Sequence, residues 1–357
     1  MKNKNLSFLC TSYKGELTAR IPWADYLFKL SSFNQVSYYF TNVSSSLTLF
    51  PSSSSLAQCS SQLRRVSLIH FFFSNFCAQH VVVGLRSVYL YYFYILLLPR
   101  RDTVLFVTGL GSLIPPSGRG LHVKTLSFLL AKSLLLFLIR IRQIRVITQN
   151  EEDQAIFSKW LNISSDLVPI ISGSGIRKFH PRTDEVHVPP RLVWIGRDIP
   201  HKNLLLAIYL ASSLPGHLHL HVLGSVSPST KFILSNVPNI HLEGWIDDPS
   251  LFLRSQDIVL VTSTYREGLS RSYLDAIAAG SWIVSCRTPG FSSISNIYPR
   301  SRFVSNPYLP FQYVGFILEI LDKQAFSHER VDSQSTDKFE HAFSTQSIVS
   351  TFVQCLS

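Results

Sequence analysis

The chain has 357 residues, of which 46% are hydrophobic and 15% are charged. This composition excludes an intrinsically disordered chain, and the length suits about two domains with their own cores. The five cysteines show no CxxC pair and no regular spacing. Neither a disulfide framework nor a zinc site is therefore expected, and a reducing cytoplasm fits best.

Positive charge is concentrated in the first part of the chain. Residues 1–150 contain 16 Lys and Arg against three acidic residues, a net charge of +13, whereas residues 151–357 contain 17 basic and 19 acidic residues, a net charge of −2. This asymmetry indicates an anionic partner for the first part, and an anionic membrane surface and nucleic acid are both candidates. A solvated basic surface without a partner would give the same pattern.

The first part of the chain predicts few elements. Strands are expected at Leu6–Thr11, Val36–Phe40, Val66–Phe73 and Val104–Thr108. No signal peptide is expected, because the first apolar run is too short. The segment Leu126–Arg145 is an apolar helix with arginines at its end, which suits a membrane interface or a buried helix of an α/β layer.

From about residue 146, strand-like and helix-like segments alternate. This alternation is typical of a doubly wound parallel sheet, in which ligands bind at the carboxyl ends of the strands. The expected helices are Glu151–Leu161, Asn203–Leu214, Leu269–Ala279 with Gly280 as its C-cap, and Phe343–Leu356. The expected strands are Arg145–Thr148, Val168–Ile171, Leu192–Ile195, Leu218–Leu223, Ile240–Leu242, Ile258–Thr262 and Trp282–Ser285.

The first chemical motif is RLVWIGRDIPHKN, at residues 191–203. A strand ends at Gly196 and is followed by Arg197 and, near the next helix, by Lys202. A glycine lets the backbone approach a diphosphate closely, and the two cations balance its charge. Basic residues at loop ends are also common surface charges, so this motif alone is weak.

The second motif is EGLSRSYLDAIAAG, at residues 267–280. Glu267 closes a loop, and Gly268, Leu269 and Ser270 present backbone N–H groups at a helix start, which is an arrangement that binds phosphate. Asp275 lies eight residues after Glu267, about 12 Å further along a helix. This span suits a nucleotide whose ribose hydroxyls meet the second carboxylate. Alternatively, Glu267 would only pair with the helix dipole, and Asp275 would only lie on a solvated face of the helix.

Taken together, these motifs resemble the family 4 retaining glycosyltransferases of GT-B fold. Their GR…K motif corresponds here to Gly196-Arg197…Lys202, and their E-x7-E motif to Glu267…Asp275. Further landmarks of the family follow in the same order. They are the strand that ends at Gly224, the segment LEGW at residues 242–245 with Gly244, the segment DIVLVTSTYREG at residues 257–268, which includes Glu267, and Pro289-Gly290. Upstream, segments such as Thr108–Gly111 and Gly173–Ile176 resemble a subgroup of bacterial polysaccharide-assembly transferases.

The resemblance implies a role for each matching residue. Arg197 and Lys202 would neutralise the diphosphate and the departing UDP, and Glu267 would contact the donor sugar. Asp275 would bind the ribose. The binding set would also include Gly196, Gly244 and the N–H groups of Gly268, Leu269 and Ser270. No metal and no cofactor is implied, because the two cations stabilise the leaving group.

The chain also departs from the family pattern. Asp275 stands where Glu is usual, and Leu269 stands where Phe is usual. Lys14-Gly15 is the nearest candidate for the first glycine-rich loop of the N-terminal domain. His70 and His80 are candidates for a functional histidine, although a structural role is the more common one.

The expected architecture is α/β and of GT-B type, with two Rossmann-like doubly wound parallel-sheet domains facing a cleft. The acceptor-side domain would span residues 1–185, the nucleotide-sugar domain residues 186–340, and a C-terminal helix at 341–357 would pack back on the first domain. The expected function is transfer of a hexose or N-acetylhexosamine, with retention, from a UDP-sugar to a lipid-linked saccharide acceptor in cell-surface polysaccharide or lipopolysaccharide biosynthesis. The enzyme would be cytoplasmic and would contact the inner face of the membrane through its basic N-terminal half.

Three alternatives remain open at this stage. One is a sugar-nucleotide epimerase or phosphorylase of the same fold. Another is a catalytically impaired membrane-associated protein that still binds nucleotide. A nucleic-acid binder is the weakest alternative, because the aromatic residues of 71–93 lie in apolar runs rather than among basic residues.

Overall fold

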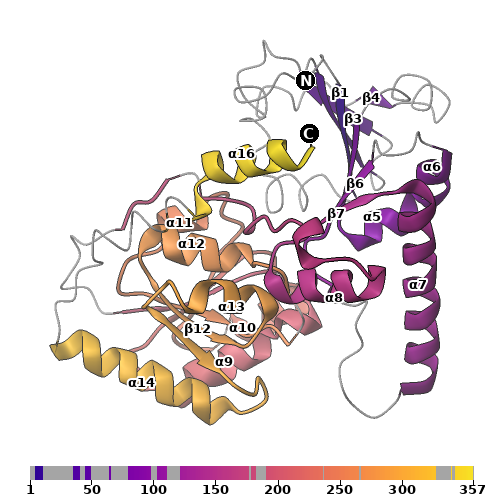
Figure 1. Cartoon of the computed structure of the whole chain (residues 1–357). Coiled ribbons are helices and arrows are strands. Elements are labelled where there is room, and N and C mark those ends of the chain that lie inside the picture. Colours follow the sequence, from indigo (N-terminus) through magenta and orange to yellow (C-terminus); the bar gives the residue numbers. More distant parts are fainter. Residues whose placement is uncertain are drawn as a thin grey trace. The chain divides into compact units, whose positions relative to one another are not determined.

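The structure is a computed structural model that describes residues 5–10, 35–40, 45–49, 64–65, 79–97, 103–110, 121–176, 178–181, 190–235, 237–264, 267–326, 339 and 342–356. The chain divides into two compact units. Unit 1 comprises Met1–Gly175 and Thr345–Ser357, and unit 2 comprises Ile176–Ser344 (Figure 1). The functional domain limits expected at 185/186 and 340/341 stay a prediction.

Unit 1 is built on a mixed sheet with the strand order β4-β3-β2-β1-β5-β6-β7. Strands β2, β1, β5, β6 and β7 pair in parallel, whereas β3 and β4 extend one edge in antiparallel pairing. The strands are β1 Asn5–Cys10, β2 Gln35–Phe40, β3 Ser45–Leu49, β4 Arg64–Arg65, β5 Gln79–Val83, β6 Thr103–Phe106 and β7 Arg145–Ile147.

Strands β1, β2, β6 and β7 confirm the strands that the sequence predicts at Leu6–Thr11, Val36–Phe40, Val104–Thr108 and Arg145–Thr148. The predicted strand Val66–Phe73, His70 and Lys14-Gly15 lie outside the described residues. His80 lies in β5. The predicted strand Val168–Ile171 is wrong. Only Ile170 pairs there, in a single bridge to Thr148, after a 3-10 turn at Ser165–Leu167.

Helices of unit 1 pack on this sheet. They are α5 Leu85–Leu90, α6 Tyr92–Leu97, α7 Leu121–Arg142, α8 Glu151–Leu161 and α16 Thr345–Leu356. The bounds of α8 match the prediction, and Asn150 caps its first turn by accepting from the Asp153 N–H. In α16, Phe352 contacts Phe8 and Phe106, so this terminal helix belongs to unit 1.

Unit 2 contains a six-stranded sheet in which all the strands are parallel, with the order β10-β9-β8-β11-β12-β13. Its strands are β8 Leu192–Ile195, β9 Leu220–Leu223, β10 Ile240–Gly244, β11 Ile258–Val261, β12 Trp282–Cys286 and β13 Ser301–Val304. The chain runs outward from β8 to β10 and then returns to β11 on the other side of β8. The strand order therefore reverses between β8 and β11, and the loops after such neighbouring strands form the usual ligand site of a doubly wound sheet.

Both faces of this sheet are covered by helices. The helical segments are η4 Pro200–Lys202, α9 Leu204–Ser213, α10 Pro228–Leu234, α11 Pro249–Phe252, α12 Arg271–Ala279, α13 Pro289–Ser295 and α14 Pro310–Phe326. Trp194 and Tyr313 anchor the core under α9 and α14, and Tyr273 anchors the core under α12. The Gly280 C-cap is confirmed by its left-handed φ of 72°. Strand β13 and helices α10, α11, α13 and α14 of unit 2 were not predicted.

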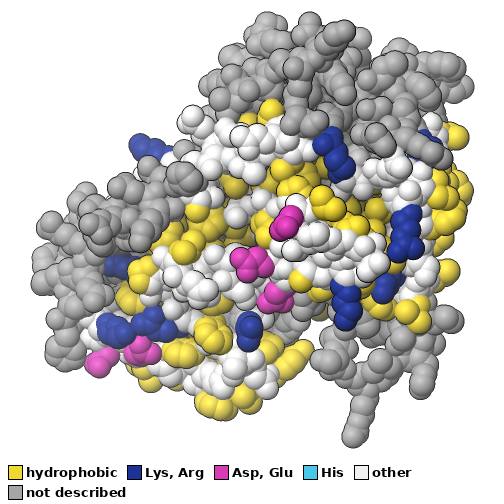
Figure 2. Space-filling model, in the orientation of Figure 1, with side chains coloured by type: hydrophobic (Ala, Val, Ile, Leu, Met, Phe, Trp, Pro, Cys, Tyr) yellow, Lys and Arg dark blue, Asp and Glu magenta, His cyan; other side chains and the backbone are white. Residues whose placement is uncertain are grey.

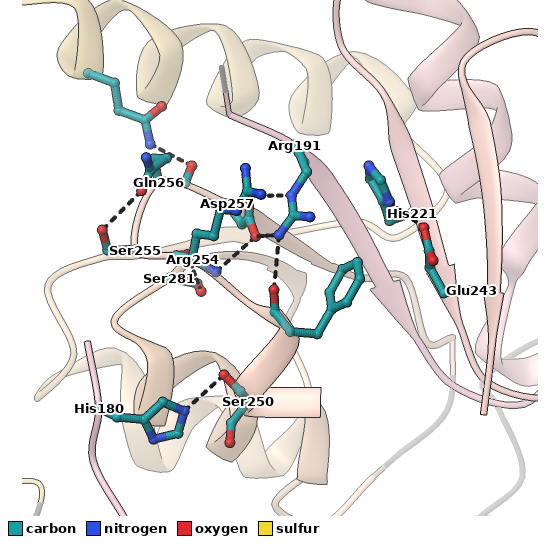
Figure 3. A network of polar contacts seen from close by, with 12 residues as sticks. His180, Arg191, His221, Glu243, Ser250, Arg254, Ser255, Gln256, Asp257 and Ser281 are labelled. Carbon is teal, nitrogen blue, oxygen red and sulfur yellow. Dashed lines mark hydrogen bonds and ion pairs between the residues drawn. The ribbon is translucent and has the colours of Figure 1, made fainter. Parts of the chain in front are cut away.

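The amino ends of the strands carry a structural ion pair. Arg191, just before β8, and Asp257, just before β11, point toward one another (Figure 3). Arg191 Nη2 lies 2.6 Å from Asp257 Oδ2, and its guanidinium stacks on the Phe252 ring at 4.6 Å. Asp257 is completely buried. This ion pair holds the amino ends of β8 and β11 together. It does not involve the carboxyl ends of these strands, where a ligand site is expected.

Among the described residues, no helix combines the length and the hydrophobicity needed to cross a membrane.

Candidate active site at the carboxyl edge of the second sheet

Three glycines mark the carboxyl ends of adjacent strands in unit 2. Gly196 follows β8, Gly224 follows β9 and Gly244 ends β10. The Gly196 N–H donates to Leu223 O at 2.9 Å, and the Gly224 N–H donates to Gly244 O at 2.6 Å. Gly224 has a φ of +131°, and a Cβ there would collide with the Gly196 carbonyl. The loops after β8 and β9 therefore pack backbone against backbone, which requires glycine at position 224.

Arg197 is an exposed cation at this edge. It directly follows Gly196 and makes no ion pair within the described part of the chain. Its guanidinium has five N–H donors in a planar fork, the geometry that binds a phosphate through two parallel hydrogen bonds.

Lys202 is held in place by buried groups of the neighbouring strand. It ends the short η4 turn, and its carbonyl and that of Asn203 lie 2.9 Å and 3.0 Å from the Thr262 hydroxyl. Thr262 in turn accepts from Trp194 Nε1 at 3.1 Å. The N–H of Thr264 also donates to the His201 carbonyl at 2.9 Å. The loop after β8 is thus fastened to the end of β11, which fixes where the lysine side chain starts.

Lys202 and Glu267 form a close ion pair across the switch point. Lys202 Nζ lies 2.7 Å from Glu267 Oε1 and 2.9 Å from Oε2. The Ser263 hydroxyl donates to Oε1 at 3.0 Å. Burial alone would raise the pKa of Glu267, but the Lys202 charge and these hydrogen bonds hold it below its ordinary value. Glu267 is therefore a carboxylate at neutral pH.

The segment after Glu267 brings backbone donors to the same place. Gly268, Leu269 and Ser270 lead into α12, whose N-cap is Ser270. Among the described residues, no acceptor bonds the N–H groups of Gly268 and Leu269. Gly290 packs directly against the Gly268 carbonyl, and a side chain at position 290 would collide with it. The start of α12 is thus a rigid set of N–H groups beside two cations, which suits an anion.

Asp275 occupies a different environment from Glu267. It lies in α12 and is completely buried, with its Oδ1 2.8 Å from Arg271 Nε. Its Oδ2 has no hydrogen-bond partner within the described residues. Burial raises the pKa of Asp275 to about 6, although the Arg271 charge opposes this. The carboxylate has spare acceptor capacity, but none of its surface is exposed.

The structure therefore brings most of the predicted site residues to the carboxyl edge of the unit 2 sheet. Gly196, Arg197 and Lys202 follow β8, and the Glu267 loop follows the adjacent strand β11. Sequence reasoning missed Thr262 and Ser263, which position Lys202 and Glu267. Their signal was the run of hydroxyl residues at the carboxyl end of β11, which is too common to single out. With two cations, one carboxylate and free N–H groups, the edge can bind a phosphate group and place a carboxylate beside it.

Part of the chain matches a known family model. Residues 189–321 match "Glycosyl transferases group 1", and this range contains every residue of the site described above. None of the curated proteins compared with this chain matches its sequence.

Solved structures resemble the whole chain in fold. Anabaena Alr3699/HepE in complex with UDP and glucose gives a TM-score of 0.68 at 13% identity, over 99% of each chain. A glycosyltransferase from Rickettsia africae gives 0.66 at 12% identity, over 100% of this chain and 98% of that chain. The apo form of the lipopolysaccharide outer core galactosyltransferase WaaB gives 0.60 at 11% identity, over 99% of both chains. The fold is therefore GT-B, with two Rossmann-like domains, and the group 1 match supports a glycosyltransferase.

Proposed function

We propose that this protein is a retaining glycosyltransferase of the family 4 type. It transfers a hexose or N-acetylhexosamine from a UDP-sugar to a lipid-linked saccharide acceptor in cell-surface polysaccharide biosynthesis. The observation that carries the proposal is the Lys202–Glu267 pair beside Arg197 and the start of α12, within the segment that matches the group 1 model. The UDP bound to the HepE structure supports the choice of donor, and the description of WaaB as a lipopolysaccharide outer core galactosyltransferase supports the acceptor class.

The diphosphate of the donor would lie between the cations and the helix start. Arg197 has no competing anion among the described residues and would bind the phosphates bidentately. Lys202 would turn from Glu267 toward the phosphate, with the N–H groups of Gly268 and Leu269 on the other side. These groups would stabilise the negative charge that develops on UDP as the glycosidic bond breaks.

Glu267 would accept hydrogen bonds from hydroxyls of the donor sugar, because it is ionised and lies next to the phosphate site. Asp275 would accept from the ribose hydroxyls. Its unpartnered Oδ2 is an acceptor of the required kind, and the carboxylate would have to become accessible when the donor binds. The acceptor hydroxyl would attack from the side on which the phosphate leaves, which gives retention.

The basic first part of the chain supports a place at the inner face of the membrane. Its net charge of +13 over residues 1–150 suits an acceptor with a phosphate or diphosphate group on an anionic surface. We propose a cytoplasmic protein in peripheral contact with that surface. The functional domains would be residues 1–185 and 186–340, followed by the helix at 341–357.

Calorimetric titration with UDP tests the donor site. Lys202→Ala removes one charge-assisted contact to the diphosphate, so its affinity for UDP should fall by about 1.5–3 kcal/mol, roughly tenfold to a hundredfold. Lys323→Ala is the matched control. It removes a lysine of the same unit whose Nζ lies 2.9 Å from Glu319, and UDP affinity should not change.

Two outcomes would contradict the proposal in different ways. Equal UDP affinity of Lys202→Ala and wild type would mean that the diphosphate binds elsewhere. If the wild type bound GDP or ADP but not UDP, the choice of nucleotide would be wrong. The position of the diphosphate site would be unaffected by that result. A panel of UDP-sugars on the wild type would then distinguish hexose from N-acetylhexosamine donors.

A further inference from the structure

Helix α12 begins with a positive charge at a place where a negative charge is the favourable one. Arg271 is its first residue, directly after the N-cap Ser270, and its first turn contains no acidic residue. The helix dipole makes this end of the helix positive, so a cation there is unfavourable unless an anion lies nearby. The N–H groups of Gly268 and Leu269 add to the positive potential. The position of Arg271 therefore points to an anion at the start of α12.

The anion that Arg271 meets in the structure is Asp275, one helical turn further on. Arg271 Nε lies 2.8 Å from Asp275 Oδ1. Long side chains of a helix normally point back toward its N-terminus. The ion pair instead draws the Arg271 side chain toward the C-terminus of α12, away from the N–H groups at the helix start. Once released from Asp275, the same side chain would turn by preference toward those N–H groups.

The Arg271–Asp275 pair is less well stabilised than the Lys202–Glu267 pair. Burial, together with the nearby charge of Asp248, raises the pKa of Asp275 to about 6, and the Arg271 charge offsets this only in part. The pKa of Glu267, by contrast, lies below its ordinary value. A raised pKa means that the ion pair does not offset the loss of hydration of the carboxylate. The release of Arg271 from Asp275 therefore costs less than the release of Lys202 from Glu267.

Asp275 also has an oxygen atom that can take another partner. Its Oδ2 is buried and has no hydrogen-bond partner within the described residues. The Asp275 side chain is completely buried, whereas the Arg271 side chain is 25% exposed, so a ligand meets the arginine first. Ribose hydroxyls that reach Asp275 would displace Arg271 and would supply hydrogen-bond donors in place of the guanidinium.

We propose that Arg271 is a further diphosphate-binding residue of the donor site, and that the ribose of the nucleotide releases it from Asp275. The ribose hydroxyls replace the guanidinium at the carboxylate, and the guanidinium turns to the diphosphate at the start of α12. Its planar fork of N–H donors then adds to the contacts from Arg197 and Lys202. UDP thus binds more tightly than pyrophosphate both through its ribose contacts and through the released arginine. This inference rests on the donor site proposed above and deepens it by naming how the site distinguishes a nucleotide from pyrophosphate.

Calorimetric titration with UDP and with inorganic pyrophosphate tests the proposal, because only UDP carries a ribose. GDP or ADP replaces UDP if the wild type binds one of them instead. Arg271→Gln should lose about tenfold in affinity for UDP, the effect of one charge-assisted contact. Its affinity for pyrophosphate should stay close to that of wild type, because Arg271 remains with Asp275 unless a ribose displaces it. Equal losses for both ligands would overturn the proposal, since a purely structural role affects both alike.

Asp275→Asn is the second variant, because it releases Arg271 without a ribose. Its affinity for pyrophosphate should rise by about tenfold. The double variant Arg271→Gln/Asp275→Asn should lose this gain, which shows that the gain requires the arginine and not only the removal of a negative charge. A damaged fold does not raise an affinity, so this comparison stays informative even if Arg271→Gln is unstable.

Arg302→Gln is the matched control. It removes an arginine of the same unit that also pairs with a carboxylate, since Arg302 Nη2 lies 3.1 Å from Glu319 Oε1. Figure 2 shows basic and acidic side chains together on the surface over α14, the helix that carries Glu319. Arg302 lies in the edge strand β13, outside the proposed donor site. This variant should therefore bind both ligands as tightly as wild type does.

Three further results would overturn the inference. The first is an Arg271→Gln variant that binds UDP as tightly as wild type while Lys202→Ala loses affinity, which would leave the proposed donor site intact. The second is a pyrophosphate affinity that does not rise in Asp275→Asn, or that rises equally in the double variant. The third is a wild type that binds neither a nucleoside diphosphate nor pyrophosphate, which would overturn the proposed donor site as well.

Discussion

Replacement of Glu267 by Gln separates the two roles proposed for the Lys202–Glu267 pair. The substitution keeps the size of the side chain and removes its negative charge. Lys202 Nζ lies 2.7 Å and 2.9 Å from the two carboxylate oxygens of Glu267, and the two side chains are only 18% and 12% exposed. Lys202 therefore has to leave a close, largely buried partner before it can bind a diphosphate.

The magnitude follows from the electrostatics of the pair. Two unit charges 4 Å apart attract by about 4 kcal/mol at an effective dielectric constant of about 20. Most of this attraction is offset by the desolvation of both ions. Glu267 therefore competes with the diphosphate for Lys202, and we expect Glu267→Gln to remove about 1 kcal/mol of this competing interaction. The affinity for UDP would then rise by roughly fivefold. UDP lacks the donor sugar, so no contact from Glu267 to the ligand is lost.

The assay is the calorimetric titration with UDP, carried out on Glu267→Gln, Lys202→Ala and the double variant. The two single variants should change the affinity in opposite directions. The double variant should resemble Lys202→Ala, because Glu267 acts on UDP only through the lysine. A Glu267→Gln variant that loses UDP affinity as strongly as Lys202→Ala would refute this reasoning, because Glu267 would then support the diphosphate itself.

Two further predictions concern unit 2 away from the donor site. Arg191→Ala should destabilise the protein by about 3–5 kcal/mol, because it leaves Asp257 charged and completely buried, whereas the UDP affinity of the folded protein should stay unchanged. Thermal unfolding measures the first effect and UDP titration the second, and an unchanged midpoint would contradict the structural role. His221 has a pKa below its ordinary value of 6.5, chiefly because of burial, so the unfolded chain binds its proton more readily and stability should fall as the pH drops through 6.5. A His221→Gln variant should lose less stability than wild type between neutral pH and about pH 5, and equal losses would show that other groups dominate.

The sequence by itself determined many of the local elements and pointed to the chemical class of the site. Helix α8 has its predicted bounds because Asn150 and three acidic residues suit its first turn. Gly280 ends α12 as predicted because glycine adopts the left-handed conformation without strain. Glycine, cations and a carboxylate at the ends of strands pointed to a nucleotide-diphosphate site.

Only the tertiary structure decided which of these groups meet. Lys202 and Glu267 are 65 residues apart in the chain, and they pair because β8 and β11 are neighbours at the point where the strand order reverses. The burial of Asp275 beside Arg271 and the anchoring of Lys202 by Thr262 also depend on contacts between distant segments. Hydrophobic periodicity reports which face of an element is apolar, and it does not report what covers that face. The complete burial of Asp275 was therefore visible only once the segments packed around α12 were known.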